Sequence, residues 1–196
     1  MQIDSAPHTT LRSDEYLGPL VEHHGRIDLE PAADFFERFV VSILRQQVSM
    51  ESAAATRERL FDAVEVTPQG FLGADEQLLR DAGLSRQKTE YVQNVAEAFE
   101  EKDYSRAYFE GMSNDAVRAE LTDIPGVGPW TANMQLIYSL GRPDVFPVGD
   151  LGIRKGMARL FENLAVEDRA EMRVRSERWA PYRSYASLYL WRDGDG

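Results

Sequence analysis

The chain has 196 residues, of which 43% are hydrophobic and 10% aromatic, and its formal net charge at pH 7 is −11. This composition predicts one folded domain, or two lobes that share a core, and excludes a chain that is disordered throughout. Cysteine is absent, which excludes disulfides, thiolate zinc sites and iron–sulfur clusters. The histidines, His8, His23 and His24, all precede residue 25 and leave little for a histidine-based metal site.

No apolar segment is long enough to span a membrane, and the first ten residues lack the basic and apolar regions of a signal peptide. We therefore expect a cytoplasmic protein with no membrane partner. Residues 1–120 carry the whole acidic excess, whereas the charges of residues 121–196 balance. This acidic, lysine-poor surface suggests adaptation to a salt-rich cell.

An acidic chain is in general a poor candidate for nucleic-acid binding, because lysine and arginine supply most of the affinity for phosphate. The local charge differs from the total. Four basic residues outnumber the acidic residues between positions 121 and 160, namely Arg142, Arg154, Lys155 and Arg159.

Helical spacing of apolar residues begins after Pro31. One broad stripe, which we expect to be buried, contains Phe35, Phe36, Phe39, Val40, Ile43, Leu44 and Val48. A second helix is predicted over residues 51–64. Residues 67–73 contain one proline and two glycines, which interrupt the pattern before a short helix at 74–82 that Gly83 ends.

The later helices have their own start signals. Ser85 is placed to cap a helix that ends near Lys102, and Ser113 is placed to cap a helix over residues 114–121. No run of alternating apolar and polar β-branched residues occurs, so the fold class predicted is all-α.

The most informative segment is residues 121–150, which begins with a hairpin motif at 121–133, LTDIPGVGPWTAN. The glycines of this motif, Gly126 and Gly128, allow a tight hairpin between a helix that ends near Leu121 and one that begins at Pro129. Amides at the start of the second helix form a natural seat for a phosphate. By itself the hairpin favours an ordinary turn between two helices, and the motifs that flank it reverse that preference.

Four ordered motifs resemble the helix–hairpin–helix DNA glycosylases, and most of all the 3-methyladenine DNA glycosylase II branch. They are RQQVS at 45–49, GLSRQK at 83–88 with Tyr91, IPGVGPWTA at 124–132 followed by Asp150, and PYRSYA at 181–186 with Trp191. The resemblance implies two helical lobes that flank an active-site cleft. It also implies a catalytic domain over residues 31–193, with residues 1–30 as a partly ordered N-terminal segment that packs on the C-terminal lobe.

The resemblance assigns the catalytic carboxylate to Asp150. Cleavage of a base–sugar bond builds positive charge on the deoxyribose, which a fixed carboxylate stabilises while it orients or deprotonates water. Asp150 is also a good N-cap for the helix that follows. The two roles are compatible, since backbone amides that donate to a carboxylate also stabilise its charge.

Trp130 occupies the position where strand-cutting members of the family carry a lysine that forms a Schiff base. The chain therefore resembles a monofunctional enzyme, and an indole at this position suits a cationic alkylated purine. Trp191 is a second candidate wall of the base pocket, or a core aromatic. Met134 and Leu151 stand where a relative has tyrosines, so the expected pocket is less aromatic.

The resemblance also implies contacts with DNA. Gln46 and Gln47 match the loop that fills the gap left by the extruded base, and a polar helix end is the alternative interpretation. The other predicted DNA-binding residues are Gly126, Val127, Gly128, Thr131, Arg154 and Lys155. Carbonyls of Thr122, Ile124 and Val127 are predicted to hold a Na⁺ or K⁺ ion, as carbonyls near a helix end lack intrahelical partners.

Together these features predict a monomeric DNA N-glycosylase that removes alkylated purines from damaged double-stranded DNA in base excision repair. It would require no cofactor and act at the nucleoid. Two alternatives remain open at this point, a related glycosylase for mismatched or oxidised bases and a non-catalytic module that only binds DNA. The presence of Asp150 favours an enzyme over the second alternative, because a module that only binds DNA does not need a carboxylate at that position.

Overall fold

The structure is a computed structural model that describes residues 6–194, and these residues contain helices and no strands. The contacts divide the chain into two compact units. The central unit is Pro31–Leu140, and the terminal unit combines Met1–Glu30 with Gly141–Gly196. Residues 1–5 of the predicted N-terminal segment lie outside the described residues. No helix in the described part of the chain is long and apolar enough to cross a bilayer.

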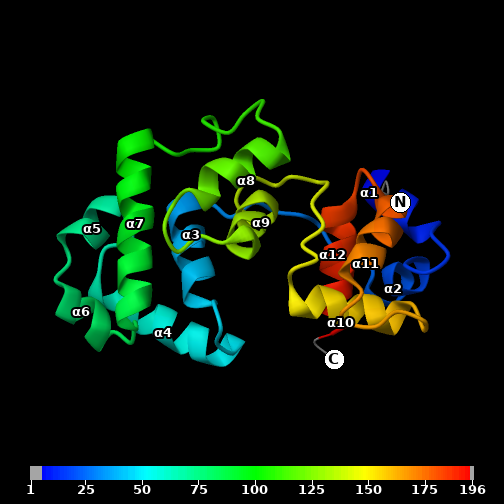
Figure 1. Ribbon diagram of the computed structural model, residues 1–196, viewed down its shortest axis with the longest axis horizontal. Helices are drawn as coiled ribbons and strands as arrows, with labels where there is room; N and C mark the ends of the chain where they lie inside the picture. Colours follow the sequence, from blue (N-terminus) through cyan, green and yellow to red (C-terminus); the bar gives the residue numbers. More distant parts are fainter. Residues whose placement is uncertain (1–5, 195–196) are drawn as a thin grey trace. The chain divides into compact units, whose positions relative to one another are not determined.

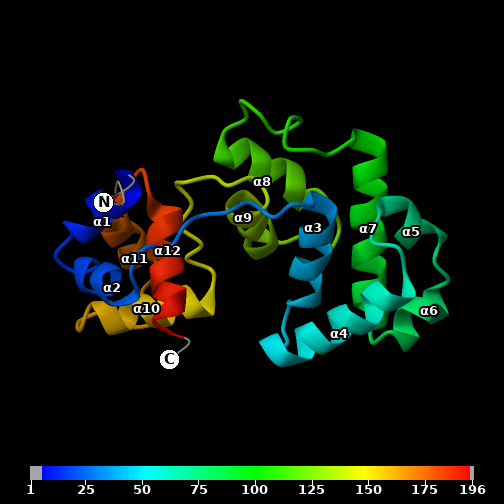
Figure 2. The same cartoon turned by 180° about the vertical axis from the view of Figure 1, so that it is seen from behind.

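The central unit is built around α7, which packs against α3, α5 and α6 (Figures 1 and 2). Its helices are α3 (Phe35–Leu44), α4 (Met50–Ala63), α5 (Pro68–Gly73), α6 (Glu76–Asp81), α7 (Arg86–Lys102), α8 (Asn114–Thr122) and α9 (Pro129–Tyr138). The ring of Phe99 on α7 lies 5.2 Å from the rings of Phe35 and Phe36. This aromatic cluster joins α7 to α3.

A buried hydrogen-bond network joins α3 to α9. Gln135 Nε2 donates to Ser42 Oγ at 2.9 Å, and Ser139 Oγ donates to Gln135 Oε1 at 2.7 Å. Because these polar groups satisfy one another away from water, the relative position of the two helices is well defined.

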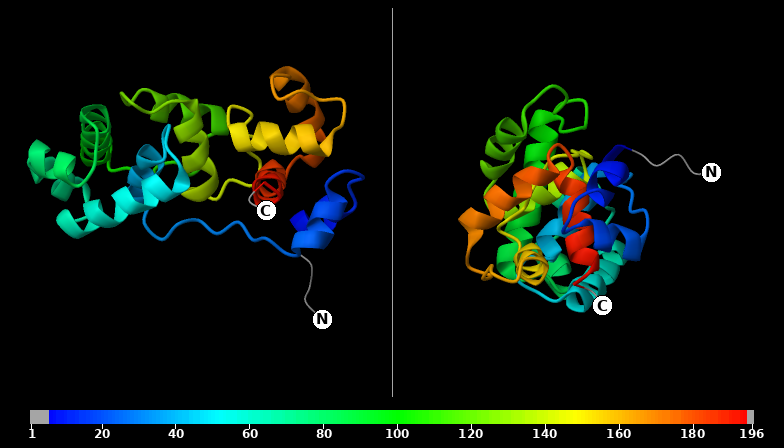
Figure 3. Two further views of the ribbon diagram at one scale, coloured as in Figure 1. Left: turned by 90° about the horizontal axis from the view of Figure 1, so that it is seen from below. Right: turned by 90° about the vertical axis from the view of Figure 1, so that its right-hand side faces the viewer.

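The terminal unit joins residues from both ends of the sequence. Its elements are α1 (Ala6–Arg12), α2 (Gly18–His24), α10 (Leu151–Leu160), α11 (Arg169–Ser176), the 3-10 helix η1 (Glu177–Trp179) and α12 (Arg183–Arg192). Leu11, Leu17 and Val21 are buried in one hydrophobic core with Trp179 and Tyr189. The α2 helix packs against α12 (Figures 1 and 3). The described N-terminal residues are therefore part of this core.

Serine, threonine and aspartate side chains begin most of the predicted helices. Ser85 accepts a hydrogen bond from the amide of Lys88, and Ser113 accepts one from Ala116, as the sequence predicts. The patterns do not predict α1, α2 or α11.

Two details of the predicted elements are wrong. Val48 is 44% exposed, because α3 ends at Leu44 and the chain turns before α4. Residues Pro68–Gly73 form a helix instead of interrupting one. Thr67 caps that helix, proline suits its first turn, and Phe71 anchors it in the core.

Candidate active site

Asp150 is the N-cap of α10 in the terminal unit. Its Oδ1 accepts a hydrogen bond of 3.0 Å from the amide of Ile153 and a second of 2.9 Å from Nε1 of Trp191 on α12. The first contact is the predicted helix cap. The second is a direct contact between the Trp191 side chain and the carboxylate of Asp150.

Gly152 allows this approach of α12 to the start of α10. A Cβ atom at this position would lie 3.0 Å from Asp150 Oδ1 and 3.0 Å from Trp191 Cδ1. Any larger residue would press on the hydrogen bond between the two side chains. The signal in the sequence is a glycine inside the first turn of a helix, where its low helix propensity is a cost.

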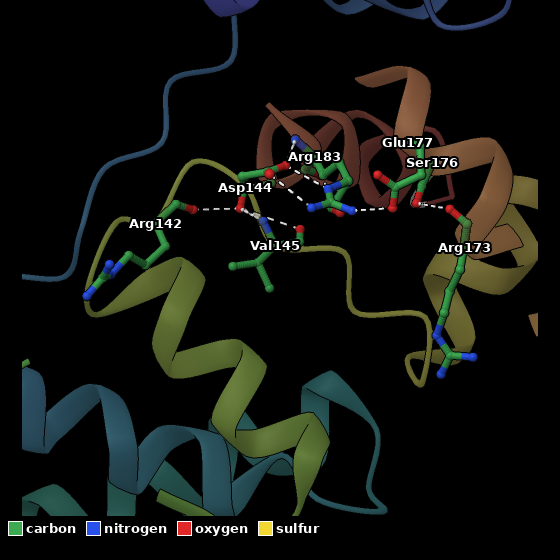
Figure 4. A network of polar contacts seen from close by, with 9 residues as sticks. Arg142, Asp144, Val145, Arg173, Ser176, Glu177 and Arg183 are labelled. Carbon is green, nitrogen blue, oxygen red and sulfur yellow. Dashed lines mark hydrogen bonds and ion pairs between the residues drawn. The ribbon is translucent and has the colours of Figure 1, made fainter. Parts of the chain in front are cut away.

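The segment that leads to Asp150 is held by the start of α12 (Figure 4). Arg183 Nε donates to Asp144 at 2.7 Å, and its Nη1 donates to Glu177 at 2.6 Å. The hydrogen bond with Asp144 raises the pKa of Arg183 above its ordinary value, whereas burial opposes the rise. Ser184 Oγ donates to the carbonyl of Arg142 at 2.6 Å and accepts from the amide of Val145 at 2.9 Å.

The PYRSYA motif therefore fixes the backbone at residues 142–145 through Arg183 and Ser184. The sequence marks the motif but not these partners, because Asp144 is 39 positions from Arg183, and Arg142 is 42 positions from Ser184.

The other predicted site residues of the terminal unit differ in their exposure and in their contacts. Leu151 is 50% exposed, and Lys155 on α10 is exposed. Arg154 instead donates from Nη1 to the carbonyl of Val166 at 3.2 Å. Its side chain therefore anchors the loop after α10, whereas Lys155 is accessible to a phosphate.

The predicted hairpin lies between α8 and α9 in the central unit. Gly126 has a φ of +95°, which side chains other than glycine rarely adopt. A Cβ there would lie 2.2 Å from the ring of Tyr91 on α7, so the hairpin packs directly on that ring. Gly128 differs, since a Cβ at that position would meet nothing within 4 Å.

The start of α9 lacks a side-chain cap, because its N-cap is Gly128. Within residues 6–194, the amides of Gly128 and Thr131 donate to no other protein group. Uncapped amides at the positive end of a helix dipole bind anions. This hairpin therefore offers backbone donors at a position where Gly128 leaves open space.

The remaining predicted residues of α9 are mostly inside the unit. Met134 is 4% exposed and the Thr131 side chain 1% exposed, while Trp130 is partly exposed in the first turn. Asp150, Leu151 and Trp191 thus lie together in the terminal unit, whereas Trp130 and Met134 belong to the central unit.

Gln46 and Gln47 have different environments. Gln46 Nε2 donates to the carbonyl of Gly126 at 3.1 Å and to Thr131 Oγ1 at 3.0 Å. Gln47 is exposed and has a φ of +58°. Of the two adjacent glutamines, Gln47 is exposed, whereas Gln46 is half-buried and bonded to the hairpin.

The hairpin carbonyls are the candidate ligands of a monovalent cation. The carbonyl of Ile124 accepts from the amide of Val127 at 3.0 Å, whereas those of Thr122 and Val127 accept no hydrogen bond within the described chain. Such orphaned carbonyl oxygens fit a Na⁺ or K⁺ ion. Within residues 6–194, no group of three or more histidine or carboxylate side chains is placed to hold a metal.

Comparisons with known proteins agree with this fold. A family model described as HhH-GPD superfamily base excision DNA repair protein matches residues 40–181. The match covers most of the chain, and the chain belongs to this family.

Two relatives are named as 3-methyladenine glycosylases. A putative DNA-3-methyladenine glycosylase of Bacillus subtilis, YfjP, is 30% identical over 185 residues, which cover 90% of this chain and 64% of the relative. DNA-3-methyladenine glycosylase 1 of Schizosaccharomyces pombe is 31% identical over 163 residues, which cover 80% of this chain and 71% of the relative. The chain thus spans about two thirds of each relative's length.

Solved structures show the same fold. The 3-methyladenine DNA glycosylase Mag1 of S. pombe, in complex with abasic DNA, matches with a TM-score of 0.88 and 28% identity, over 98% of each chain. A DNA-3-methyladenine glycosidase of Bacillus halodurans matches with a TM-score of 0.84 and 32% identity, over 99% of this chain and 91% of that chain. The all-α glycosylase fold and the family resemblance are confirmed.

Proposed function

We propose that this protein is a monofunctional DNA N-glycosylase that flips an alkylated purine out of damaged double-stranded DNA and hydrolyses its bond to deoxyribose. The observation that carries the proposal is the Asp150 carboxylate, held at the start of α10 by the amide of Ile153 and the indole of Trp191. The names of the relatives support 3-methyladenine as the type of base removed.

The carboxylate acts on charge that develops during bond cleavage. As the bond between base and sugar breaks, positive charge grows on the deoxyribose, and Asp150 stabilises it. Water then adds to the sugar and loses a proton, which gives a free base and an abasic site. Since Ile153 and Trp191 fix the carboxylate in advance, little reorganisation is needed during the reaction.

The lysines support hydrolysis without strand cleavage. Trp130 replaces the lysine of the strand-cutting enzymes, and an indole cannot form a Schiff base. Lys88 Nζ donates to the carbonyl of Leu44 at 2.6 Å, and Lys102 Nζ donates to Glu120 at 2.6 Å. The exposed Lys155 is placed on α10, where a phosphate contact is its simplest role.

Binding to the duplex relies on the hairpin. Backbone amides of Gly128 and Thr131 bind a phosphate, and a Na⁺ or K⁺ ion held by the carbonyls of Thr122, Ile124 and Val127 supplies positive charge at the same turn. No cofactor takes part in the chemistry. The enzyme acts as a monomer on nucleoid DNA, and its acidic surface is an adaptation to high salt.

The test is product analysis on duplexes that each contain one defined lesion, comparing wild type with Asp150→Asn. We expect wild type to release alkylated purine and leave an intact strand that breaks only in hot alkali. Asp150→Asn retains the shape and loses the charge, so excision should fall about a hundredfold or more. Asp62→Asn, an exposed aspartate on α4, is the matched control.

Three results would contradict parts of this proposal. Release of a mismatched or oxidised base in preference to alkylated purine would favour the alternative glycosylase. A covalent adduct trapped by borohydride would show lyase chemistry. If the protein bound every duplex and released no base, the result would favour the alternative of a non-catalytic DNA-binding module.

A further inference from the structure

The loop between α3 and α4 is held at both ends. Where α3 ends, Lys88 Nζ on α7 donates to the carbonyl of Leu44 at 2.6 Å. Where α4 begins, Ser49 accepts from the amide of Ser52 at 3.2 Å. Between these points Gln47 has a φ of +58°, an uncommon conformation for a residue other than glycine. Such a conformation persists only where the surroundings enforce it.

The same helix α7 also holds the hairpin. The ring of Tyr91 lies against Gly126, and Gln87 Nε2 donates to the Tyr91 hydroxyl at 2.6 Å. One turn further along, Asn94 Nδ2 donates to the carbonyl of Pro125 at 3.1 Å. The GLSRQK motif with Tyr91, which catalysis does not explain, thus holds both the loop and the hairpin.

Gln46 makes the direct connection between the loop and the hairpin. A glutamine amide has two N–H donors, and both are used, one by the carbonyl of Gly126 and one by Thr131 Oγ1. Gln46 would lose both bonds if it turned outward to contact DNA. Gln46 is half-buried and Thr131 is buried, so the connection lies within the central unit.

We propose that Gln46 is a positioning residue that joins the loop and the hairpin into one rigid body, so that only Gln47 fills the gap left by a flipped base. This inference rests on the glycosylase function proposed above. Once the hairpin binds a phosphate, a loop fixed to it presents Gln47 at a set distance from the strand. A loop that moved freely would have to be ordered on every binding event, which weakens insertion.

The experiment is a double-mutant cycle with a duplex that carries 2-aminopurine beside a stable abasic-site analogue. Fluorescence of 2-aminopurine reports unstacking and requires no base release. We expect Gln46→Ala and Gln47→Ala each to lower the unstacking equilibrium about tenfold, the scale of one or two lost hydrogen bonds. If Gln46 acts through Gln47, the double variant should match Gln47→Ala alone.

Two further measurements separate positioning from a general structural defect. Affinity for an undamaged duplex, which reports the hairpin, should stay within about twofold of wild type for Gln46→Ala. Gln46→Met, which keeps the length and packing without donors, should behave like Gln46→Ala. Gln77→Ala is the matched control, since Gln77 makes an exposed hydrogen bond to Asp81 within α6.

Additive losses in the double variant would overturn the proposal, because Gln46 would then act on its own. Wild-type unstacking by Gln46→Met would overturn it as well. If wild type releases no base from any lesion duplex but the cycle still shows coupling, the proposed reaction fails while the positioning role stands.

Discussion

The indole Nε1 of Trp191 donates a 2.9 Å hydrogen bond to Oδ1 of Asp150, although the two residues are separated by 41 positions in the chain. The bond joins the last described helix of the terminal unit to the N-cap of α10. Gly152 is the residue that makes room for it. An aromatic residue that the sequence suggests as a pocket wall is therefore also an orienting partner of the candidate catalytic carboxylate.

Trp191→Phe should keep most of the apolar surface and remove the N–H donor. We expect single-turnover excision to fall about tenfold, since a hydrogen bond to a charged group is involved. Affinity for abasic DNA should change much less, because the bond orients a reacting group and does not itself bind the strand. Excision at the wild-type rate would show that the indole N–H does not position Asp150.

The two hairpin glycines should respond differently to alanine. Gly126→Ala should lower thermal stability, because its Cβ would overlap the Tyr91 ring and its φ is positive. Gly128→Ala should leave stability unchanged, since its Cβ meets nothing, yet it should weaken binding to damaged and undamaged duplexes alike. Melting curves and affinities at one fixed salt concentration check both outcomes. A loss confined to lesion DNA would place Gly128 in the base pocket.

Glu120 should contribute to stability in a pH-dependent way. A hydrogen bond from Lys102, followed by one from the Tyr104 hydroxyl, holds the pKa of Glu120 below its usual value, while burial opposes the shift. A carboxyl whose pKa is lower in the folded state stabilises the protein above its unfolded pKa, and the contribution is lost as pH falls through the folded pKa.

Glu120→Gln should therefore lower the free energy of unfolding at neutral pH and make it depend less on pH below about pH 5. Denaturant unfolding at a series of pH values gives the measurement. Glu97→Gln, an exposed position on α7, is the control. Equal pH profiles for wild type and Glu120→Gln would show that protonation of Glu120 does not affect the free energy of unfolding.

The acidic surface predicts an unusual response to salt. At about 1 M salt the Debye length is about 3 Å, so repulsion within the protein and between protein and duplex is screened. If only a few basic side chains contact phosphates of the DNA, affinity should fall only slowly as the salt concentration rises. We expect excision to persist in molar KCl and the melting temperature to rise from low to molar salt. Activity that peaks at low salt and vanishes by a few hundred millimolar would contradict salt adaptation.

Local signals in the sequence predict much of this fold. Ser85, Ser113 and Asp150 begin helices because a cap needs only a side-chain oxygen and the amides that follow it. Val48 is predicted wrongly because the end of α3 is set by Lys88 and Gln46, whose partners are distant in sequence. Periodicity carries no information about such contacts.

The contacts of the candidate site also fall into those that the local sequence predicts and those that depend on the fold. A helix cap at Asp150 follows from its neighbours in the chain. The hydrogen bond of Asp150 to Trp191 and the ion pair of Arg183 with Asp144 depend on which helices pack together. Only the three-dimensional fold determines that packing.

The terminal unit is built from both ends of the sequence, and this sets the order in which the two units can fold during synthesis. Tyr189 donates to the carbonyl of Gly25 at 2.9 Å, and Leu11 and Leu17 share a core with Ile153 and Trp179. The central unit is one continuous stretch, so it can complete its contacts as it leaves the ribosome. By contrast, α1 and α2 are made before it but must wait for α12, which is synthesised after it. On the ribosome, these early helices keep their apolar faces uncovered the longest, and that interval is when the nascent chain is most exposed to aggregation.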